Sequence, residues 1–234
     1  MPYQQETDEE SPHFREVLPG ECTSLSLQKK NKNRISVFVK GEYVAGFYQQ
    51  VILDYKLTVG MTVTAGLLAA MRQSEQRCLI RERCFVWLGR RAHSRHELKK
   101  KALQKNFPVG DIDFVLDDLD EKGYLNDQEF AILFAGDKSK IYGWGPQKIR
   151  AALFQKGVEK HYIDTALDEA VSLEDMVAHL YRTVRKAKQR FLRTNDAFKR
   201  KKKLVDFLQR KGYTLEVILA EAESLLKIIE DDKF

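Results

Sequence analysis

The chain has 234 residues, 43% of them hydrophobic, and 40 Lys and Arg against 34 Asp and Glu give a formal net charge of +6. This apolar content suffices for one sizeable core or several small ones, and no apolar run approaches the roughly 20 residues of a membrane-spanning helix. The acidic, polar start argues against a secretory signal peptide, and three cysteines without CxxC spacing favour a reduced compartment. We therefore expect a cytoplasmic protein without membrane contact, whose mild positive charge favours an acidic or polyanionic partner.

The first residues predict a tail followed by a small β-structure. Acidic and polar residues over 1–32 predict a mobile tail. Alternation then places Ile35, Val37 and Val39 on one face, and Gly41 follows at a turn, so the segment 33–65 is predicted to hold a β-hairpin. Because a lone hairpin is only marginally stable, it should pack on the helices that follow.

From about residue 65 the apolar period is helical to the end of the chain. It predicts a first helical repeat over 66–124, a second over 125–172 and a third over 173–234. The expected helices are 66–91, 94–106, 110–122, 126–139, 146–156, 159–171, 173–192, 196–211 and 214–229.

The three repeats align with one another without gaps, at offsets of 51 and 55 residues. The matching positions include Leu98 with Ile149 and Leu204, Ala102 with Leu153 and Leu208, and Ile112 with Ile163 and Ile218. A repeat of this length is one supersecondary unit used several times. The predicted fold is therefore mostly α, with three tandem three-helix repeats in an elongated array and a small N-terminal β-hairpin.

Capping signals support these helices. Ser94 and Glu97 have the spacing of a capping box, and Asn126 with Glu129 repeats it more weakly. Pro146 falls at a first helical position, where its missing N–H costs nothing. Gly157 and Gly212 follow lysines at expected helix ends, as a left-handed cap requires, and Asn106 stands at the matching place in the first repeat.

The segment 182–203 is the strongest candidate for a binding site. It holds eleven cations and one acid, Asp196, with apolar residues interleaved, which is typical of a helical surface that tracks phosphates. The alternative is a solvated face, since lysine-rich helices also serve solubility. A second cluster lies at 90–101, and two cations flank Ile149. The candidate residues for contact with a partner or nucleic acid are Arg90, Arg91, Arg95, Lys99, Lys100, Lys101, Lys148, Arg150, Arg182, Arg185, Lys186, Lys188, Arg190, Arg193, Lys199, Arg200, Lys201, Lys202 and Lys203.

Other chemistry is weakly supported. The stretch 118–129 has acids at positions 1, 3 and 12 of a calcium loop, but Lys122 occupies position 5, where an oxygen ligand belongs. His93 and His96 have HxxH spacing without a third ligand at metal spacing. No motif supports a catalytic triad or paired carboxylates, so we expect no enzyme, no metal and no cofactor.

Three stretches together resemble one known family. Residues 90–98 (RRAHSRHEL) resemble the entry to the first repeat of RecX, the bacterial regulator of the RecA recombinase. Residues 119–131 (LDEKGYLNDQEFA) resemble the junction to its second repeat, and GWGPQKIR at 143–150, continuing through KGV at 156–158, resembles that repeat. The resemblance covers about residues 75–225 and leaves the N-terminal hairpin outside the shared core. Residue 106 departs from the family, being Asn where Gly is usual, and the third repeat carries a long basic helix.

The resemblance implies a non-enzymatic regulator active in DNA repair, homologous recombination and the SOS response. Its expected partners are RecA, the RecA–DNA filament and DNA itself, and its expected effect is to restrain strand exchange and co-protease activity. We expect a monomer. Three alternatives stay open: a free-standing nucleic-acid-binding helical repeat protein, a calcium-responsive helix-loop-helix switch, and a scaffold that binds no nucleic acid.

Overall fold

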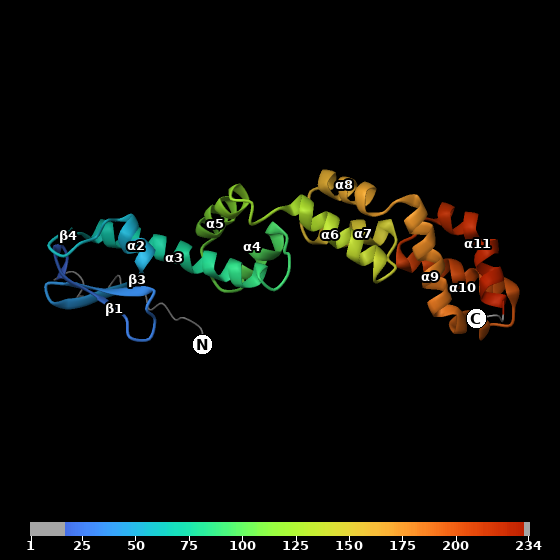
Figure 1. Ribbon diagram of the computed structural model, residues 1–234, viewed down its shortest axis with the longest axis horizontal. Coiled ribbons are helices and arrows are strands. Elements are labelled where there is room, and N and C mark those ends of the chain that lie inside the picture. The colour runs from blue at the N-terminus through green and yellow to red at the C-terminus, as the bar shows by residue number, and fades with distance from the viewer. Residues whose placement is uncertain (1–16, 232–234) are drawn as a thin grey trace. The chain divides into compact units, whose positions relative to one another are not determined.

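Residues 17–231, apart from the side chain of Leu173, are described by a computed structural model (Figure 1). Its strands are β1 (Gly20–Leu27), β2 (Arg34–Val39), β3 (Glu42–Tyr48) and β4 (Thr62–Val63), and helix α2 (Gln49–Asp54) follows β3. The helices after β4 are α3 (Ala65–Leu88), α4 (Arg95–Leu103), α5 (Val109–Glu121), α6 (Asp127–Lys140), α7 (Pro146–Gln155), α8 (Lys160–Ala170), α9 (Leu173–Leu192), α10 (Ala197–Lys211) and α11 (Leu215–Glu230).

The chain forms two compact units. One contains the described residues up to Val86 together with Ala102–Val115, and the other contains Trp87–Lys101 together with the described residues from Leu116 onward. Helices α3, α4 and α5 each contribute residues to both units.

The predicted hairpin is present as the antiparallel pair β2–β3. Lys40 and Gly41 form its turn with φ of 53° and 83°, the left-handed backbone that matches a two-residue turn to the twist of its strands. This hairpin is one edge of a larger sheet, whose antiparallel strands lie in the order β3-β2-β1-β4.

Strand β1 differs from the sequence prediction, which places it in the mobile tail of residues 1–32; residues 1–16 of that tail lie outside the described part of the chain. Only Gly20 and Cys22 of β1 are buried, and its register with β2 shifts between Cys22 and Ser24. A bulge interrupts the period of two, so an alternation test misses the strand. Helix α2 was also not predicted, because six residues with two buried side chains carry no periodic signal.

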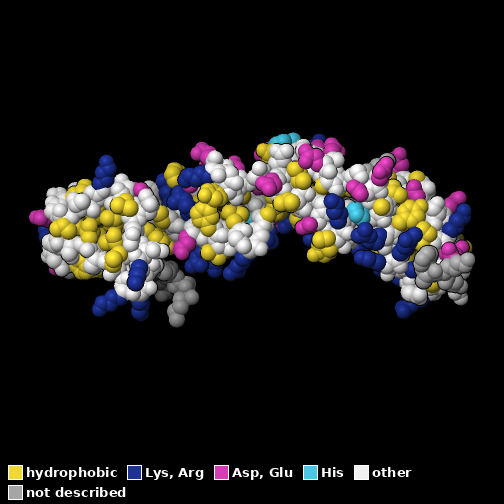
Figure 2. Space-filling model, in the orientation of Figure 1, with side chains coloured by type: hydrophobic (Ala, Val, Ile, Leu, Met, Phe, Trp, Pro, Cys, Tyr) yellow, Lys and Arg dark blue, Asp and Glu magenta, His cyan; other side chains and the backbone are white. Residues whose placement is uncertain are grey.

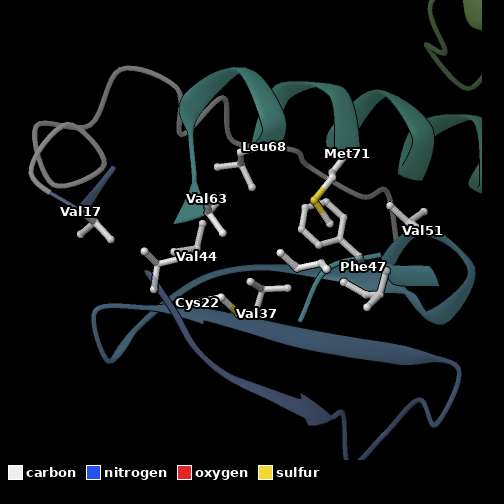
Figure 3. Packing of buried hydrophobic residues seen from close by; sticks show 12 residues of the cluster. Val17, Cys22, Val37, Val44, Phe47, Val51, Val63, Leu68 and Met71 are labelled. Carbon is white, nitrogen blue, oxygen red and sulfur yellow. The ribbon is translucent and has the colours of Figure 1, made fainter. Parts of the chain in front are cut away.

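The sheet buries one face against α3, as expected of a hairpin that cannot stand alone. Figure 3 shows Val37, Val44 and Phe47 of the sheet pointing toward Leu68 and Met71 of the helix. At the edge of this core Glu75 of α3 is 2.8 Å from the Arg34 guanidinium and accepts a hydrogen bond of 2.7 Å from the backbone N–H of Tyr48. The ion pair and the hydrogen bond fix the helix on β2 and β3.

The three predicted three-helix domains are confirmed, and the helix ends agree with the prediction to within about one turn. The second domain has its own core, which includes Phe130, Ile149 and Ile163. The third has another, which includes Leu204 and Ile218. In the first domain the aligned positions are buried too: Leu98, Ala102 and Ile112 are fully enclosed.

The predicted caps form. The N–H of Glu97 donates to the Ser94 hydroxyl at 3.2 Å, and the N–H of Ser94 donates back to the Glu97 carboxylate at 3.3 Å. The Asn126 side chain accepts from the N–H of Glu129 at 3.0 Å. The three residues expected in left-handed backbone have φ of 60° at Asn106, 73° at Gly157 and 92° at Gly212.

The middle helices of the three domains are α4, α7 and α10, and the same junction joins α4 to α7 and α7 to α10. The Ser94 hydroxyl, at the start of α4, donates to the carbonyl of Lys156 at the end of α7 (2.6 Å). The N–H of Gly145, at the start of α7, donates to the carbonyl of Lys211 at the end of α10 (2.7 Å). Since Ser94 aligns with Gly145 in the repeat, equivalent positions make equivalent contacts, and each middle helix begins where the next one ends.

Candidate nucleic-acid interface

The basic segment 182–203 spans the end of α9, a short connection and the start of α10. Its apolar residues Val184 and Phe191 are buried in the core of the third domain, as is Leu204, which follows the segment directly. Apolar residues at helical spacing turn one side of each helix inward and leave the cations toward solvent. Asp196, the one acid, caps α10 by accepting from the N–H of Lys199 at 2.9 Å.

Three of the predicted cations serve inside the third domain. The Lys203 ammonium donates to the carbonyl of Arg190 (2.9 Å) and to the hydroxyl of Thr194 (3.2 Å), closing the end of α9. Arg200 donates to the carbonyl of Thr194 (3.1 Å) and pairs with Glu230 of α11, and the ammonium of Lys188 donates to the carbonyl of Asp231. The composition of the segment suggests one continuous outward surface, but these bonds show that part of it faces its own domain.

The other cations of the segment face solvent. Arg193, Lys199, Lys201 and Lys202 are exposed and form no ion pair within residues 17–231, and we call these four residues the α10 patch. Phe198 lies among them with 78% of its surface exposed, although a phenyl ring is usually buried. Figure 2 shows Lys and Arg side chains gathered over the third domain, with a histidine at the edge of the group.

On α9, Arg182, Arg185, Lys186 and Arg190 are also exposed. Arg182 donates weakly to the carbonyl of Lys140 at 3.5 Å, and the guanidinium of Arg190 lies 5.5 Å from the centre of the Phe207 ring.

In the cluster at 90–101, too, some cations bond to neighbouring side chains and others face solvent. Arg91 makes two hydrogen bonds to the Glu97 carboxylate, at 3.0 and 3.1 Å, and Arg95 pairs with Asp117 at 2.6 Å. The Lys101 ammonium is 2.6 Å from the His93 ring, and burial followed by the nearby Arg91 lowers the pKa of this lysine. Arg90 and Lys100 are exposed, and Lys99 is half-buried.

The two cations predicted beside Ile149 lie on α7 but have separate neighbours. The Lys148 ammonium lies 4.5 Å from the centre of the Trp144 ring, and Arg150 pairs with Asp164 of α8. A cation over an indole face is an attractive contact, so Lys148 stays close to this aromatic surface.

The structure adds candidate residues that sequence reasoning missed. A cavity of about 200 Å³ between α6, α9 and α10 is lined by the predicted Arg182 and Lys186 and by two cations that were not predicted, Lys140 and Lys211. Lys140 and Lys211 each end a helix, where a cation is readily explained by the helix dipole. A surplus of lysines at those two helix ends was the only signal in the sequence, and it did not show that they converge.

His179 lies beside the same cavity and was not predicted. It is 8% exposed, and its Nδ1 is 3.1 Å from the Ser139 hydroxyl. Burial lowers its pKa first, and the positive charges of Arg182 and Lys140 lower it further, against the opposing effect of Asp175. The imidazole is therefore neutral at neutral pH.

The chemical alternatives find little support in the described residues. Within 17–231, no three His, Cys, Asp or Glu side chains cluster as metal ligands. In the calcium-like stretch the Lys122 ammonium pairs with Asp118, the first acid of the proposed loop, at 2.6 Å. Burial raises the pKa of the Cys84 thiol to about 11, which disfavours the reactive thiolate.

No helix in the described part of the chain is long and apolar enough to span a membrane.

These features define a class of protein in which a small N-terminal sheet is followed in the chain by tandem three-helix domains with basic surfaces. Protein-family comparisons match all four parts of the chain. Residues 20–64 match the regulatory protein RecX N-terminal domain, and residues 81–119, 126–167 and 174–220 match the first, second and third three-helix domains of RecX. The chain belongs to the RecX family. The expectation that the hairpin lies outside the family's shared region is wrong, since that segment matches a domain of its own.

Individual relatives agree. The chain is 27% identical over 214 residues to "Regulatory protein RecX" of Listeria monocytogenes serotype 4b (strain CLIP80459), covering 89% of this chain and 78% of the relative. It is 28% identical over 199 residues to the protein of that name from Clostridium botulinum (strain Eklund 17B / Type B), covering 85% and 93%.

Two solved structures share the fold. A crystal structure of regulatory protein RecX has a TM-score of 0.74 at 21% identity, over 91% of this chain and 100% of that chain. The structure of RecX from Lactobacillus salivarius has a TM-score of 0.57 at 15% identity, over 67% and 98%.

Proposed function

We propose that this chain is a cytoplasmic, monomeric, non-enzymatic regulator that binds RecA or RecA–DNA filaments and restrains recombinase and co-protease activity. Its family membership supports the regulatory role, since its relatives carry the name regulatory protein RecX. The observation that carries the interface is the α10 patch, four exposed cations that form no ion pair within residues 17–231. A filament of protein on DNA is a polyanion at close range, and unpaired cations bind it by releasing its counterions.

The mechanism is contact rather than chemistry. Basic residues occur on all three helical domains, so several weak contacts act together once the first has formed, which raises the effective affinity. A protein held across neighbouring filament subunits competes with the DNA strand that must enter during exchange. Arg90 and Lys100 of the first domain would extend the interface begun by the α10 patch, because both are exposed.

The test is cosedimentation with RecA–DNA filaments, with RecA ATPase activity as a second measurement. Replacing Lys199, Lys201 and Lys202 with Glu should weaken filament binding by tenfold or more, roughly what the loss of several phosphate contacts removes. The side chains of these three lysines are exposed and form no hydrogen bond or ion pair within residues 17–231, so helicity measured by circular dichroism should not change.

The matched control replaces Lys29, Lys30 and Lys32 with Glu, an equal charge change on three exposed residues between β1 and β2. This control should bind filaments nearly as the unmodified protein does. Equal filament affinity of the α10 patch variant and the unmodified protein at two salt concentrations would rule the patch out. Equally tight binding to naked DNA and to filaments at one salt concentration would favour the free-standing nucleic-acid-binding alternative.

A further inference from the structure

The cavity between α6, α9 and α10 concentrates positive charge without any acid. Lys140 comes from the end of α6, Arg182 and Lys186 from successive turns of α9, and Lys211 from the end of α10. None of the residues that line the cavity is Asp or Glu. Like charges four residues apart on a helix repel, and gathering two further cations around the same space adds to this cost. An anion in the cavity would remove the repulsion.

Two contacts fix the walls of the cavity. The Lys211 ammonium donates to the carbonyl of Tyr142 at 3.3 Å, which holds the end of α10 at the cavity rim. Gly143 has φ of 60°, and a Cβ there would lie 2.1 Å from the Thr183 hydroxyl of α9. Only glycine therefore allows the loop after α6 to approach α9 this closely, and this approach forms one side of the cavity.

The size of the cavity favours a small anion. Pockets for whole small molecules commonly measure roughly 300–1,000 Å³. The cavity here measures about 200 Å³, which suits one phosphate group with its water rather than a complete nucleotide.

The surface beside the cavity favours a phosphate that belongs to a nucleic-acid strand. Tyr142, which lines the cavity, has 54% of its surface exposed, and the Lys138 ammonium is 4.2 Å from the centre of its ring. Trp144 follows, half-buried against the core of the second domain, with the Lys148 ammonium 4.5 Å from its ring centre. An exposed aromatic ring beside lysines, as at Tyr142, is a usual means by which proteins hold single strands, with the ring on a base and the cations on the backbone.

We propose that this cavity binds one backbone phosphate of a single-stranded nucleic acid, and that Tyr142 stacks on a base next to it. The choice of a nucleic-acid strand rests on the proposed function, since a regulator of a DNA-bound filament meets DNA. The site itself is separate from the α10 patch, because Lys140 and Lys211 lie outside that patch.

The first experiment measures binding of a short labelled oligodeoxythymidylate by fluorescence anisotropy at several salt concentrations. Replacing both Lys140 and Lys211 with Gln should weaken binding about tenfold, the usual loss for a charge-assisted contact. Losing one phosphate contact should also reduce the steepness of the salt dependence by about 0.7 in log–log form. The matched control replaces Lys160 and Lys227, exposed lysines of α8 and α11 away from the cavity, and should change neither quantity.

The second experiment follows the His179 ring by NMR over a pH titration. The groups around this ring are Lys140 of α6 and Asp175 and Arg182 of α9, and Lys186 of α9 and Lys211 of α10 line the same cavity. A phosphate among these cations favours the charged imidazole, so the oligonucleotide should raise the pKa of His179. Inorganic phosphate at the same phosphate concentration should raise it less, because it lacks the stacked base.

Several outcomes would overturn the inference. An equal effect of inorganic phosphate would make the cavity a site for free phosphate, and an unchanged His179 with a tightly bound oligonucleotide would place the strand elsewhere. If the double Gln variant lost filament binding but kept oligonucleotide binding, the cavity would hold an acidic group of the filament protein. If that variant failed to fold, Lys140→Gln alone, at an exposed side chain, would repeat the test. None of these results depends on the α10 patch variant, so the two proposals can fail separately.

Discussion

Glu97 shows how one side chain can hold two domains together. Burial raises the pKa of its carboxyl, but hydrogen bonds from Arg91 and Lys156 outweigh this and bring the pKa to about 2. Lys156 belongs to the second domain and is 2.6 Å from the carboxylate, while Ser94 of the first domain bonds the backbone of the same lysine. Arg91 was predicted as an interface residue, yet its geometry assigns it to this network.

The network predicts a pH dependence of stability. The folded pKa of Glu97 lies below its ordinary value of 4.5, so its contribution is complete above pH 4.5 and is lost as the pH falls toward 2. Glu97→Gln should therefore cost on the order of 2 kcal/mol at pH 7, after allowance for solvent screening, and progressively less below pH 4.5. Urea denaturation between pH 2 and 7 measures both.

The control for this prediction is Glu129→Gln, the same change at the same position of a capped helix. Glu129 is exposed, and its side chain makes no ion pair within residues 17–231. Replacing it should therefore change the free energy of unfolding little at every pH. A loss for Glu97→Gln that stays constant from pH 7 to 2 would contradict the role of its charge.

At the residue scale the sequence predicted capping residues well, but it did not predict which contacts individual cations make. It identified the caps at Ser94 and Asn126 because a capping residue and its partner lie within one turn of chain. It did not separate Lys203, bonded to the end of α9, from Lys201, which faces solvent. Neighbouring lysines look alike in sequence, and only the packing of α10 on α9 decides which one finds a carbonyl.

At the scale of elements, the repeated junction explains why glycine recurs at the ends of the middle helices. Gly212 has φ of 92°, and a Cβ there would lie 2.5 Å from the backbone nitrogen of Lys148. A Cβ on Gly157 would similarly lie 2.4 Å from the Cβ of His96. These glycines end their own helices and also admit the start of the preceding middle helix.

The junction predicts a difference between two glycines of similar backbone geometry. Gly212→Ala should lower the free energy of unfolding by about 2–4 kcal/mol, because the left-handed backbone strain and the overpacking against Lys148 add together. Gly123→Ala, with φ of 72° and nothing within 4 Å of the added Cβ, should lose only about 1–2 kcal/mol from the strain. Chemical denaturation of both variants measures the difference, and equal losses would show that the junction contributes little.

Elements were the most predictable level of this protein. Helices α3 to α11 follow from apolar residues at helical spacing and from their caps, which are local signals. Strand β1 was missed because its bulge and polar residues hide the alternation, and α2 because it is short. Both depend on contacts with residues far along the chain rather than on their own pattern.

For the whole molecule, the α10 patch sets an expectation for salt dependence. If Arg193, Lys199, Lys201 and Lys202 each neutralise one phosphate of duplex DNA in a filament, the log–log slope of affinity against salt should be about −3 to −4 between roughly 50 and 200 mM. Titrations of the unmodified protein with RecA–DNA filaments measure this slope. A slope near zero would mean that the patch meets no phosphate and would favour a scaffold that binds no nucleic acid.

The sequence by itself determined the three-helix repeat, the caps at its helix ends and the family to which the chain belongs. These follow from local periodicity, from hydrogen bonds within a turn and from motifs in a fixed order. Only the tertiary structure decided which cations bond within their own domain, where Lys140, Arg182, Lys186 and Lys211 converge, and how one middle helix begins at the end of the next. These depend on packing between segments that lie far apart in the chain, and the spacing of residues along a single helix carries no record of that packing.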